Sequence, residues 1–294
     1  MVLKRTLGEK MFDFFNVCFM LLIIFITLYP MMYVVFASLS DPNELSKHLG
    51  MLWRPLGFTL NGYELVLANE NIITGYKNTL FYVVFGTAAN LLMTSLGAYV
   101  LSRKWFMLRN PILLMITFTM FFSGGIIPLF LILNSIGLIN TRLAMIIPNV
   151  ISVWNLIVMK TSFEAIPAGM EESAKIDGAN DFIVFAKIIL PLSLPIIAVM
   201  GLFYGVANWS EWFSAVMYLK DRELFPLQLF MREILILSND AETMRSMVMS
   251  GETEAYSKLV KYCTIIVSTV PILLVYPFIQ KYFVKGIMIG AVKG

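Results

Sequence analysis

The chain has 294 residues, of which 59% are hydrophobic and only 14% are charged, and its formal net charge is +3 at pH 7. A soluble domain carries about 25% charged residues, so this composition excludes an ordinary soluble protein. The small positive charge does not indicate nucleic-acid binding. Apolar runs recur along the chain and are continuous rather than alternating, which favours membrane-spanning helices over a barrel.

Six apolar segments are long enough to cross a bilayer, which requires about 20 residues for about 30 Å of hydrocarbon. They are residues 12–38, 78–101, 110–133, 143–161, 188–219 and 260–280. The sequence therefore predicts an all-α polytopic membrane protein with six transmembrane helices. We expect one transmembrane domain over residues 1–294, with its core spans between 78 and 280.

The first apolar segment is too long for the core of a signal peptide, and no small-residue cleavage site follows it, so we expect a retained span. Both cysteines, Cys18 and Cys263, lie inside apolar runs. Their spacing predicts neither a disulfide framework nor a metal site, and we expect small buried apolar residues.

Two of the expected spans contain signals for an interruption. The third holds Ser123-Gly124-Gly125 followed by Pro128, so its outer end is expected to be broken. The fifth is too long for a single crossing. We expect it to extend past the membrane surface or to bend near Gly201 and Gly205.

The distribution of Lys and Arg sets the orientation, because these residues concentrate in short cytoplasmic loops. The clearest signal is the short loop of residues 102–109, which carries three basic residues and no acid. Placing this loop inside puts both termini in the cytoplasm. Two longer loops, residues 39–77 and 220–259, then lie outside. The second outer loop is unusually apolar, which suits either a segment lying on the lipid headgroups or a surface on which a delivery protein lands.

The polar segment between the fourth and fifth spans reads as two short helices joined by a turn. Pro167 suits a first helical position, and Glu171 can pair with Lys175 four residues later. Gly178 can end the first helix in a left-handed conformation, and Asp181 can cap the second.

This segment, residues 162–187, combines charges with small residues such as Ser173, Ala174 and Ala179. A short helix of this kind can lie deep in a groove of another protein and transmit motion to the attached spans. An ordinary amphipathic connector between two spans fits the same residues.

A motif in this segment resembles a known family. The pattern Glu-x-Ala-x-x-x-Gly, nine further residues and Ile-x-Leu-Pro is similar to the coupling loop of importer permeases of the ATP-binding-cassette class. It is met by Glu172, Ala174, Gly178, Ile188, Leu190 and Pro191. Ser173 departs from the usual alanine, which exchanges one small residue for another.

Further strings resemble the carbohydrate-uptake branch of that class. They are Ile-Asp-Gly-Ala at 176–179, Asn-Trp-Ser-Glu-Trp-Phe at 208–213 and the tail at 290–294. The tail is similar to that of second subunits of maltose permeases. Residues 122–128 and 227–229 resemble the subgroup that imports complex oligosaccharides or polysaccharide fragments.

The resemblance implies a permease subunit whose short cytoplasmic helix docks into a cleft of an ATPase. The docking residues carried over are Glu171, Glu172, Ser173, Ala174, Lys175, Asp177, Gly178 and Ala179. Glu172 is expected to pair with a basic residue of the ATPase. Gly290, Val292, Lys293 and Gly294 of the tail are expected to contact it as well.

The implied partners are a homologous second permease subunit, two cytoplasmic nucleotide-binding ATPase subunits and an extracytoplasmic sugar-binding protein, all acting at the lipid bilayer. ATP and magnesium are expected on the ATPase, so this chain needs no cofactor of its own.

Polar and aromatic groups within the spans are candidates for the translocation pathway, because sugars bind aromatic faces and amide or carboxylate groups. These candidates are Asn149, Asn155, Asn208, Trp209, Glu211 and Trp212. The tryptophans are also suited to anchor at the membrane interface, and the asparagines to bridge helices.

No catalytic constellation stands out. The single histidine, His48, lies in an outer loop, and no phosphate-binding Gly-Lys-Ser/Thr loop occurs, so the ATPase must be another chain. The alternatives are a permease of the same class for a peptide or a lipid-linked glycan, an ion-coupled carrier, or a membrane-embedded enzyme. A carrier would need intramembrane carboxylates, of which only Glu211 is a candidate, and an enzyme would need paired intramembrane groups.

Overall fold

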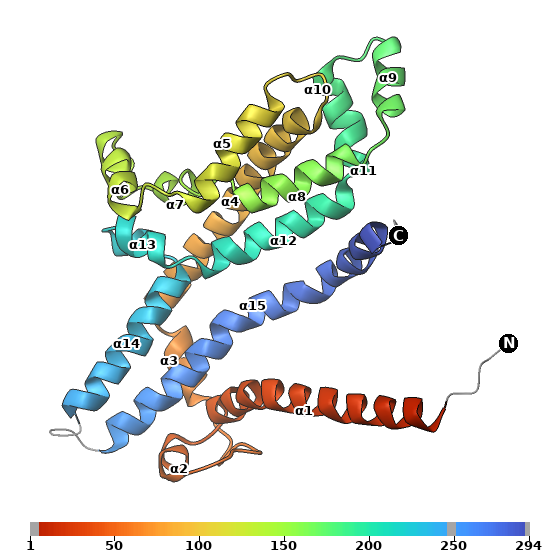
Figure 1. Cartoon of the computed structure of the whole chain (residues 1–294). Helices are drawn as coiled ribbons and strands as arrows, with labels where there is room; N and C mark the ends of the chain where they lie inside the picture. The colour runs from red at the N-terminus through yellow and green to blue at the C-terminus, as the bar shows by residue number, and fades with distance from the viewer. Residues whose placement is uncertain (1–5, 246–250, 292–294) are drawn as a thin grey trace. The chain divides into compact units, whose positions relative to one another are not determined.

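The computed structural model describes residues 6–245 and 251–291, and most of these residues are helical (Figure 1). Within them the only strand-like pairing is an isolated bridge between Ser40 and Phe58. The elements are α1 (Leu7–Ser38), α2 (Pro42–Lys47), α3 (Asn61–Leu67), α4 (Glu70–Ser102), α5 (Arg109–Phe121), α6 (Ile126–Ser135), α7 (Leu143–Ile146), α8 (Val153–Glu164), α9 (Ala168–Ile176), α10 (Asp181–Val184), η1 (Phe185–Ile189), α11 (Leu190–Leu192), α12 (Leu194–Ser210), α13 (Phe213–Tyr218), η2 (Arg222–Leu224), α14 (Leu227–Arg245) and α15 (Gly251–Ala291).

Backbone contacts divide the chain into two compact units. The first unit is Met1–Asn69 with Glu233–Thr269, and the second unit is Glu70–Arg232 with Val270–Gly294. The second unit contains both the docking segment and the candidate pathway residues, so it carries the functional argument.

In the first unit, α1 begins with a capping box in which Thr6 and Glu9 bond each other's backbone N–H groups. Only Ala37 and Ser38, at its far end, are buried, so nearly the whole helix presents apolar side chains outward. Such a surface is stable in lipid or against another apolar helix.

The packing of the first unit explains one glycine and one cysteine. A Cβ at Gly62 would lie 2.6 Å from the sulfur of Cys263, so α3 can approach α15 only with glycine there. Cys263 is buried, and its thiol donates to the carbonyl of Ser38 at 3.3 Å. The expectation of buried cysteines therefore holds for Cys263 but not for Cys18, which is exposed on α1.

In the second unit, α4 packs along α8 and α12. Small residues permit this approach, since a Cβ at Gly86 would lie 2.9 Å from the side-chain nitrogen of Asn208. The largest fully buried side chains of the core cluster are Phe163, Met159, Ile189 and Met200. This core lies at the same end of α4 and α8 as α9.

Within the described ranges, three helices are long and apolar enough to cross a membrane, namely Leu7–Ser38, Glu70–Ser102 and the Ala255–Leu274 part of α15. Two bent pairs raise the number to five if each pair is one span. In the first pair, α5 and α6 meet at 113°, and Gly125 between them has a φ of +88°. The expected break at the outer end of the third span is confirmed, because glycine alone adopts this conformation readily.

The expected bend of the fifth span at Gly201 and Gly205 is wrong. Both glycines lie inside the continuous helix α12, and the 82° bend falls at Ser193, between α11 and α12. Pro195 has no N–H to donate to the carbonyl of Pro191, so the backbone ladder is interrupted there. A Cβ at Gly201 or Gly205 would meet side chains of α4 at 3.6 and 3.9 Å, which are ordinary van der Waals distances, so the packing of α12 on α4 does not require glycine at either position.

The expected fourth span, residues 143–161, is not one continuous helix either. It is divided into α7 and α8 by a non-helical stretch around Pro148. The 12 residues of α8 extend about 18 Å, well short of the hydrocarbon thickness.

Candidate functional site

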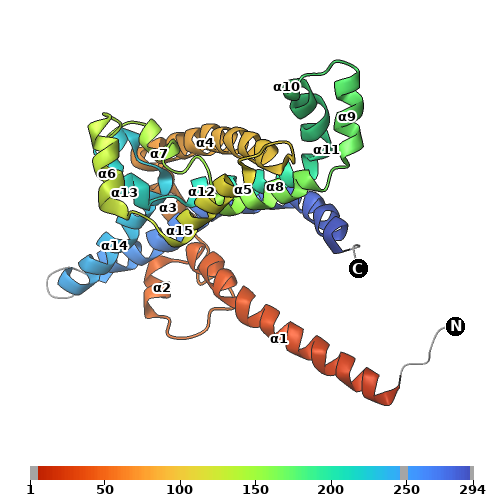
Figure 2. The ribbon, with the colours of Figure 1, turned by 45° about the horizontal axis from the view of Figure 1, so that its top comes forward.

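The expected docking helix is α9, which lies beside α10 at one end of the second unit (Figures 1 and 2). It begins one residue later than expected, since Pro167 occupies the N-cap position and Ala168 is the first helical residue. Its length of nine residues corresponds to two and a half turns, about 13 Å.

The C-terminal end of α9 is fixed by Gly178, as expected from the sequence. The amide of Ala179 donates to the carbonyl of Ala174 at 2.9 Å, and the amide of Gly178 donates to the carbonyl of Lys175 at 3.1 Å. This pair of bonds is a Schellman motif, which requires a left-handed residue at the position of Gly178. Its φ is +85°, and a Cβ there would meet no atom within 4 Å. The requirement for glycine is therefore conformational rather than steric.

One face of α9 packs against its own chain. Glu171, Ala174 and Lys175, spaced three and four residues apart, make the contacts of this face. Ala174 packs partly buried against the core cluster of the second unit. This inner face leaves the remaining residues of the helix free for a partner.

The opposite face of α9 is exposed along its whole length. Gly169, Glu172, Ser173 and Ile176 lie on it at helical spacing, and Ile176 is 86% exposed. The hydroxyl of Ser173 donates to the carbonyl of Gly169, so it is satisfied within the helix. The outer face thus offers one carboxylate, one large apolar side chain and a small, flat surface between them.

The expected pair of Glu171 with Lys175 is not formed. Glu171 is buried and makes an ion pair with Arg103, the residue that follows α4. Its carboxylate is therefore occupied within the chain, unlike that of the exposed Glu172. Sequence reasoning did not anticipate this pairing because Arg103 lies far from Glu171 along the chain.

Lys175 instead contacts Asp181 and Trp105. Its ammonium nitrogen lies 2.8 Å from the Asp181 carboxylate and 5.5 Å from the centre of the Trp105 ring. Asp181 does not cap α10 as expected, since Asn180 occupies the N-cap and accepts from the amide of Ile183 at 2.9 Å. The cap falls one residue earlier, which leaves Asp181 available to Lys175.

The electrostatics of this end of the unit keep Arg103 charged. Burial lowers the pKa of its guanidinium, and the neighbouring Tyr99 and Glu164 raise it. Glu164 itself pairs with Lys160 at 2.8 Å and lies 3.9 Å from Arg109. Because an arginine pKa starts far above neutrality, the buried cation persists at physiological pH.

The pathway candidate Asn208 bridges helices. Its side-chain amide donates to the oxygen of Asn90 at 3.0 Å and to the hydroxyl of Thr87 at 3.2 Å. Asn90 in turn donates to the backbone carbonyls of Asn149 and Val150 at 2.7 and 3.0 Å. The network therefore supplies donors to two carbonyls of the broken backbone before α8.

Other pathway candidates also have partners inside the chain. The backbone N–H of Asn155, rather than its side chain, donates to the N-cap hydroxyl of Ser152, and the Glu211 carboxylate accepts from the backbone N–H of Ser214 at 2.8 Å. Trp209 is buried. Trp212 is partly exposed, and the guanidinium carbon of Arg232 lies 3.6 Å from its ring centre. Of the six candidates, Trp212 is the aromatic side chain with exposed surface.

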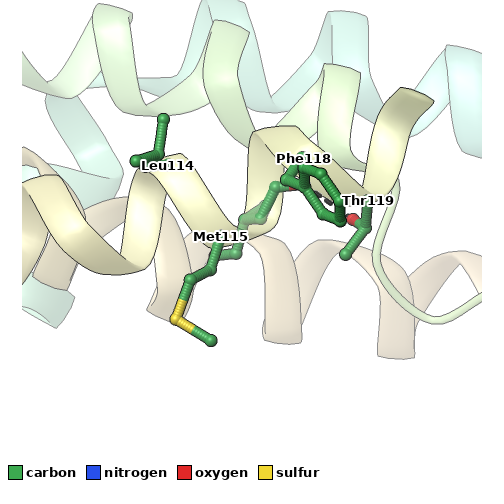
Figure 3. Close-up of a pocket in the computed structure, with 5 residues that line it drawn as sticks. Leu114, Met115, Phe118 and Thr119 are labelled. Atoms are coloured by element: carbon green, nitrogen blue, oxygen red, sulfur yellow. Dashed lines mark hydrogen bonds between the residues drawn. The ribbon is translucent and has the colours of Figure 1, made fainter. Parts of the chain in front are cut away.

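The cavities of the second unit are apolar. One of about 510 Å³ is lined by α4, α12 and α15, with Thr87 and Trp209 its only hydrogen-bonding side chains among the described residues. A shallower groove follows α5, which buries none of its residues (Figure 3). Its Thr119 hydroxyl donates to the carbonyl of Ile116, so the groove is apolar as well. Both surfaces suit an apolar helix or lipid better than a sugar.

The tail residues are only partly described. Gly290 lies in the last turn of α15, while Val292, Lys293 and Gly294 lie outside the described residues. In the part of the chain that the structure describes, no three His, Cys, Asp or Glu side chains are grouped so as to hold a metal ion.

Comparison with known proteins identifies the family. Residues 106–289 match the family described as binding-protein-dependent transport system inner membrane component, and this match includes the whole docking segment and α12. The chain belongs to this family. It is thus a membrane permease component of an ATP-binding-cassette transport system, as the coupling motif implied.

Individual relatives extend the match over nearly the whole permease. The polygalacturonan/rhamnogalacturonan transport system permease protein YtcP of Bacillus subtilis is 41% identical over 97% of this chain and 99% of its own length. Protein LplC of the same organism is 38% identical over 99% of this chain and 98% of its own length. A solved bacterial ATP-binding-cassette transporter involved in the import of the acidic polysaccharide alginate matches with a TM-score of 0.85 and 30% identity, covering 95% of this chain and 99% of that one.

Proposed function

We propose that this permease imports oligosaccharides or polysaccharide fragments, and that it does so by coupling its outer face on α9 to a cytoplasmic ATPase. The observation that carries this proposal is the division of α9 into two faces. Glu171 is buried against the chain, while Glu172 and Ile176 point away from it. One face of this helix packs against its own chain and the other face is exposed. Such a helix is suited to bind in a groove of a partner protein.

In the proposed assembly, two ATPase subunits bind ATP and magnesium, and a homologous second permease covers the apolar surfaces of this one. The chain crosses the membrane six times with both termini inside, which places residues 102–109 and α9 on the same, cytoplasmic side. An external binding protein delivers the sugar to the outer loops. The C-terminal tail contacts the ATPase.

In the proposed mechanism, ATP draws the two ATPase subunits together and moves α9 with them. The spans attached to α9 then rock from an inward-facing to an outward-facing arrangement. Sugar leaves the binding protein and enters the opened pathway, and hydrolysis of ATP returns the spans to the first arrangement. This chain supplies the pathway wall and the moving helix, and its partner supplies the hydrolysis.

We further propose that the substrate carries carboxylates. Two of the similar proteins are named for polygalacturonan/rhamnogalacturonan and for the acidic polysaccharide alginate. Beside the pathway candidate Trp212, Arg232 stacks on the ring, and among the described residues no acidic side chain forms an ion pair with it. An aromatic face next to a guanidinium suits a uronic acid, because the ring contacts the sugar and the cation meets its carboxylate.

The docking role is tested by purifying a tagged chain from membranes and identifying the bound subunits by mass spectrometry. The unaltered chain should bring down a nucleotide-binding subunit and a second permease. Glu172→Lys should reduce the recovered ATPase at least five-fold, because it reverses the charge of the exposed carboxylate. Glu64→Lys, an equally exposed change on α3, serves as the control. Recovery of no ATPase with the unaltered chain would contradict the proposal.

The substrate class is tested separately, by uptake of a labelled oligogalacturonate and of a neutral malto-oligosaccharide of equal length. Cells with the unaltered permease should take up the anionic sugar preferentially. Arg232→Gln should reduce that preference at least three-fold without changing recovery of the ATPase. Equal uptake of both sugars by the unaltered chain would reject a carboxylate-bearing substrate while leaving the importer assignment intact.

A further inference from the structure

Arg103 connects three elements at the end of the second unit from which α9 extends. Its Nε donates to the hydroxyl of Ser102 at 2.9 Å, and one terminal nitrogen donates to the carbonyl of Phe163 at 2.9 Å. The other terminal nitrogen makes the ion pair with Glu171. One guanidinium therefore binds the end of α4, the last turn of α8 and the docking helix α9.

The contact with Phe163 has a cause in the sequence. In a continuing helix, the carbonyl of Phe163 would accept from the amide four residues later, and that residue is Pro167, which has no N–H. The carbonyl accepts from the amide of Ile166 at 3.4 Å, and the guanidinium supplies a second donor at the shorter distance of 2.9 Å. A cation at this position is also favoured by the dipole of α8, whose negative end lies there.

The ion pair is shielded from water. The side chains of Arg103 and Glu171 are 7% and 9% exposed, and the Tyr99 ring lies 5.1 Å from the guanidinium. A buried pair of this kind is costly to break, because removal of one partner leaves an uncompensated charge. It is a stiffer connection than the second contact of α9, in which Lys175 and Asp181 are 41% and 53% exposed.

We infer that Arg103 and Glu171 form a positioning pair that makes α9 move as one body with α4 and α8. This inference rests on the proposed function of α9 as a docking helix and assigns its two neighbouring carboxylates different roles. Glu172 binds the ATPase, and Glu171 passes the movement of α9 to the spans. Without the pair, α9 remains joined by its short flanking turns, the small apolar contact of Ala174 and the exposed Lys175 contact, so it docks but is less rigidly coupled to α4 and α8.

The test compares Glu171→Ala with Glu172→Ala, the same change at adjacent positions on opposite faces. Each assembly is purified and placed in proteoliposomes, and two quantities are measured: the ATPase recovered with the tagged permease, and the sugar imported per ATP hydrolysed. Glu171→Ala should recover ATPase within two-fold of the unaltered chain, but import at least five-fold less sugar per ATP. Glu172→Ala should lose at least five-fold of the recovered ATPase.

A second variant guards against a folding defect. Glu171→Gln keeps an oxygen that can accept from Arg103, so its sugar import per ATP should lie between those of Glu171→Ala and the unaltered chain. A merely structural role would lower the amount of assembly without changing this ratio.

Two results would overturn the inference. The first is a ratio of sugar to ATP within two-fold of the unaltered chain for Glu171→Ala or, if that variant does not assemble, a ratio for Glu171→Gln equal to that of the unaltered chain. The second is a loss of ATPase from the Glu171 variants as large as that from Glu172→Ala. Failure of the proposed function itself is recognised separately, because the unaltered chain would then recover no ATPase.

Discussion

At the scale of single residues, the docking helix depends on one backbone angle and one buried charge. Gly178 holds a φ of +85° in open space, so any side chain would fit there but few could adopt the angle. Its role was predictable, because the signal for a helix end is local. The partner of Glu171 was not predictable from the sequence. Lys175 lies at the ideal helical spacing, whereas Arg103 comes close to Glu171 only through the packing of α4.

Gly178→Val and Gly178→Asn should therefore differ. A β-branched residue in the left-handed region costs about 1–2 kcal/mol, whereas asparagine tolerates that region. We expect Gly178→Val to lower the initial rate of labelled oligosaccharide uptake at least five-fold and Gly178→Asn less than two-fold. Gly8→Val, at an open position on α1 without positive φ, is the control. Equal rates for the two Gly178 variants would show that the angle is not the constraint.

At the scale of elements, the interruptions of the helices follow from proline, glycine and the polar groups that satisfy the freed backbone. The Gly-Gly signal before α6 was read correctly. The break before α8 was missed although Pro148 marks it, because hydropathy alone stays high through it. The bend of the fifth span was assigned to Gly201 and Gly205, but both glycines lie inside the continuous helix α12, and Pro195 causes the bend.

Asn90 is the polar residue that stabilises the break before α8. Asn90→Leu removes the donors to the carbonyls of Asn149 and Val150 and the acceptor for Asn208. Each buried polar group left without a partner lowers the free energy of unfolding by about 1–3 kcal/mol. We expect a lower midpoint of thermal unfolding in detergent than for Leu92→Ala, a change at an exposed position on the same helix. Equal midpoints for the two variants would contradict this role.

At the scale of the whole molecule, composition predicted a helical membrane protein, and the coupling motif predicted that it is a permease and which family it belongs to. The number of membrane spans was harder to predict from the sequence. Among the described residues, three helices are long enough to cross a membrane, or five spans if each bent pair is one, because three of the six apolar segments are divided or bent by local backbone breaks. The candidate pathway was also only partly predictable, since polar residues that bridge helices and polar residues that meet a sugar have the same sequence signature.

The whole account depends on the outer face of α9 lying in the cytoplasm against an ATPase. The most direct measurement labels Ile176→Cys with a membrane-impermeant maleimide, in a chain that also carries Cys18→Ala and Cys263→Ser. Ile176 is 86% exposed in the single chain. The thiol of Ile176→Cys should therefore react readily with the maleimide unless a partner covers it. We predict no labelling in intact cells, strong labelling in inside-out vesicles stripped of the ATPase, and protection when the ATPase is restored. Labelling from outside in intact cells, or equal labelling with and without the ATPase, would contradict the account.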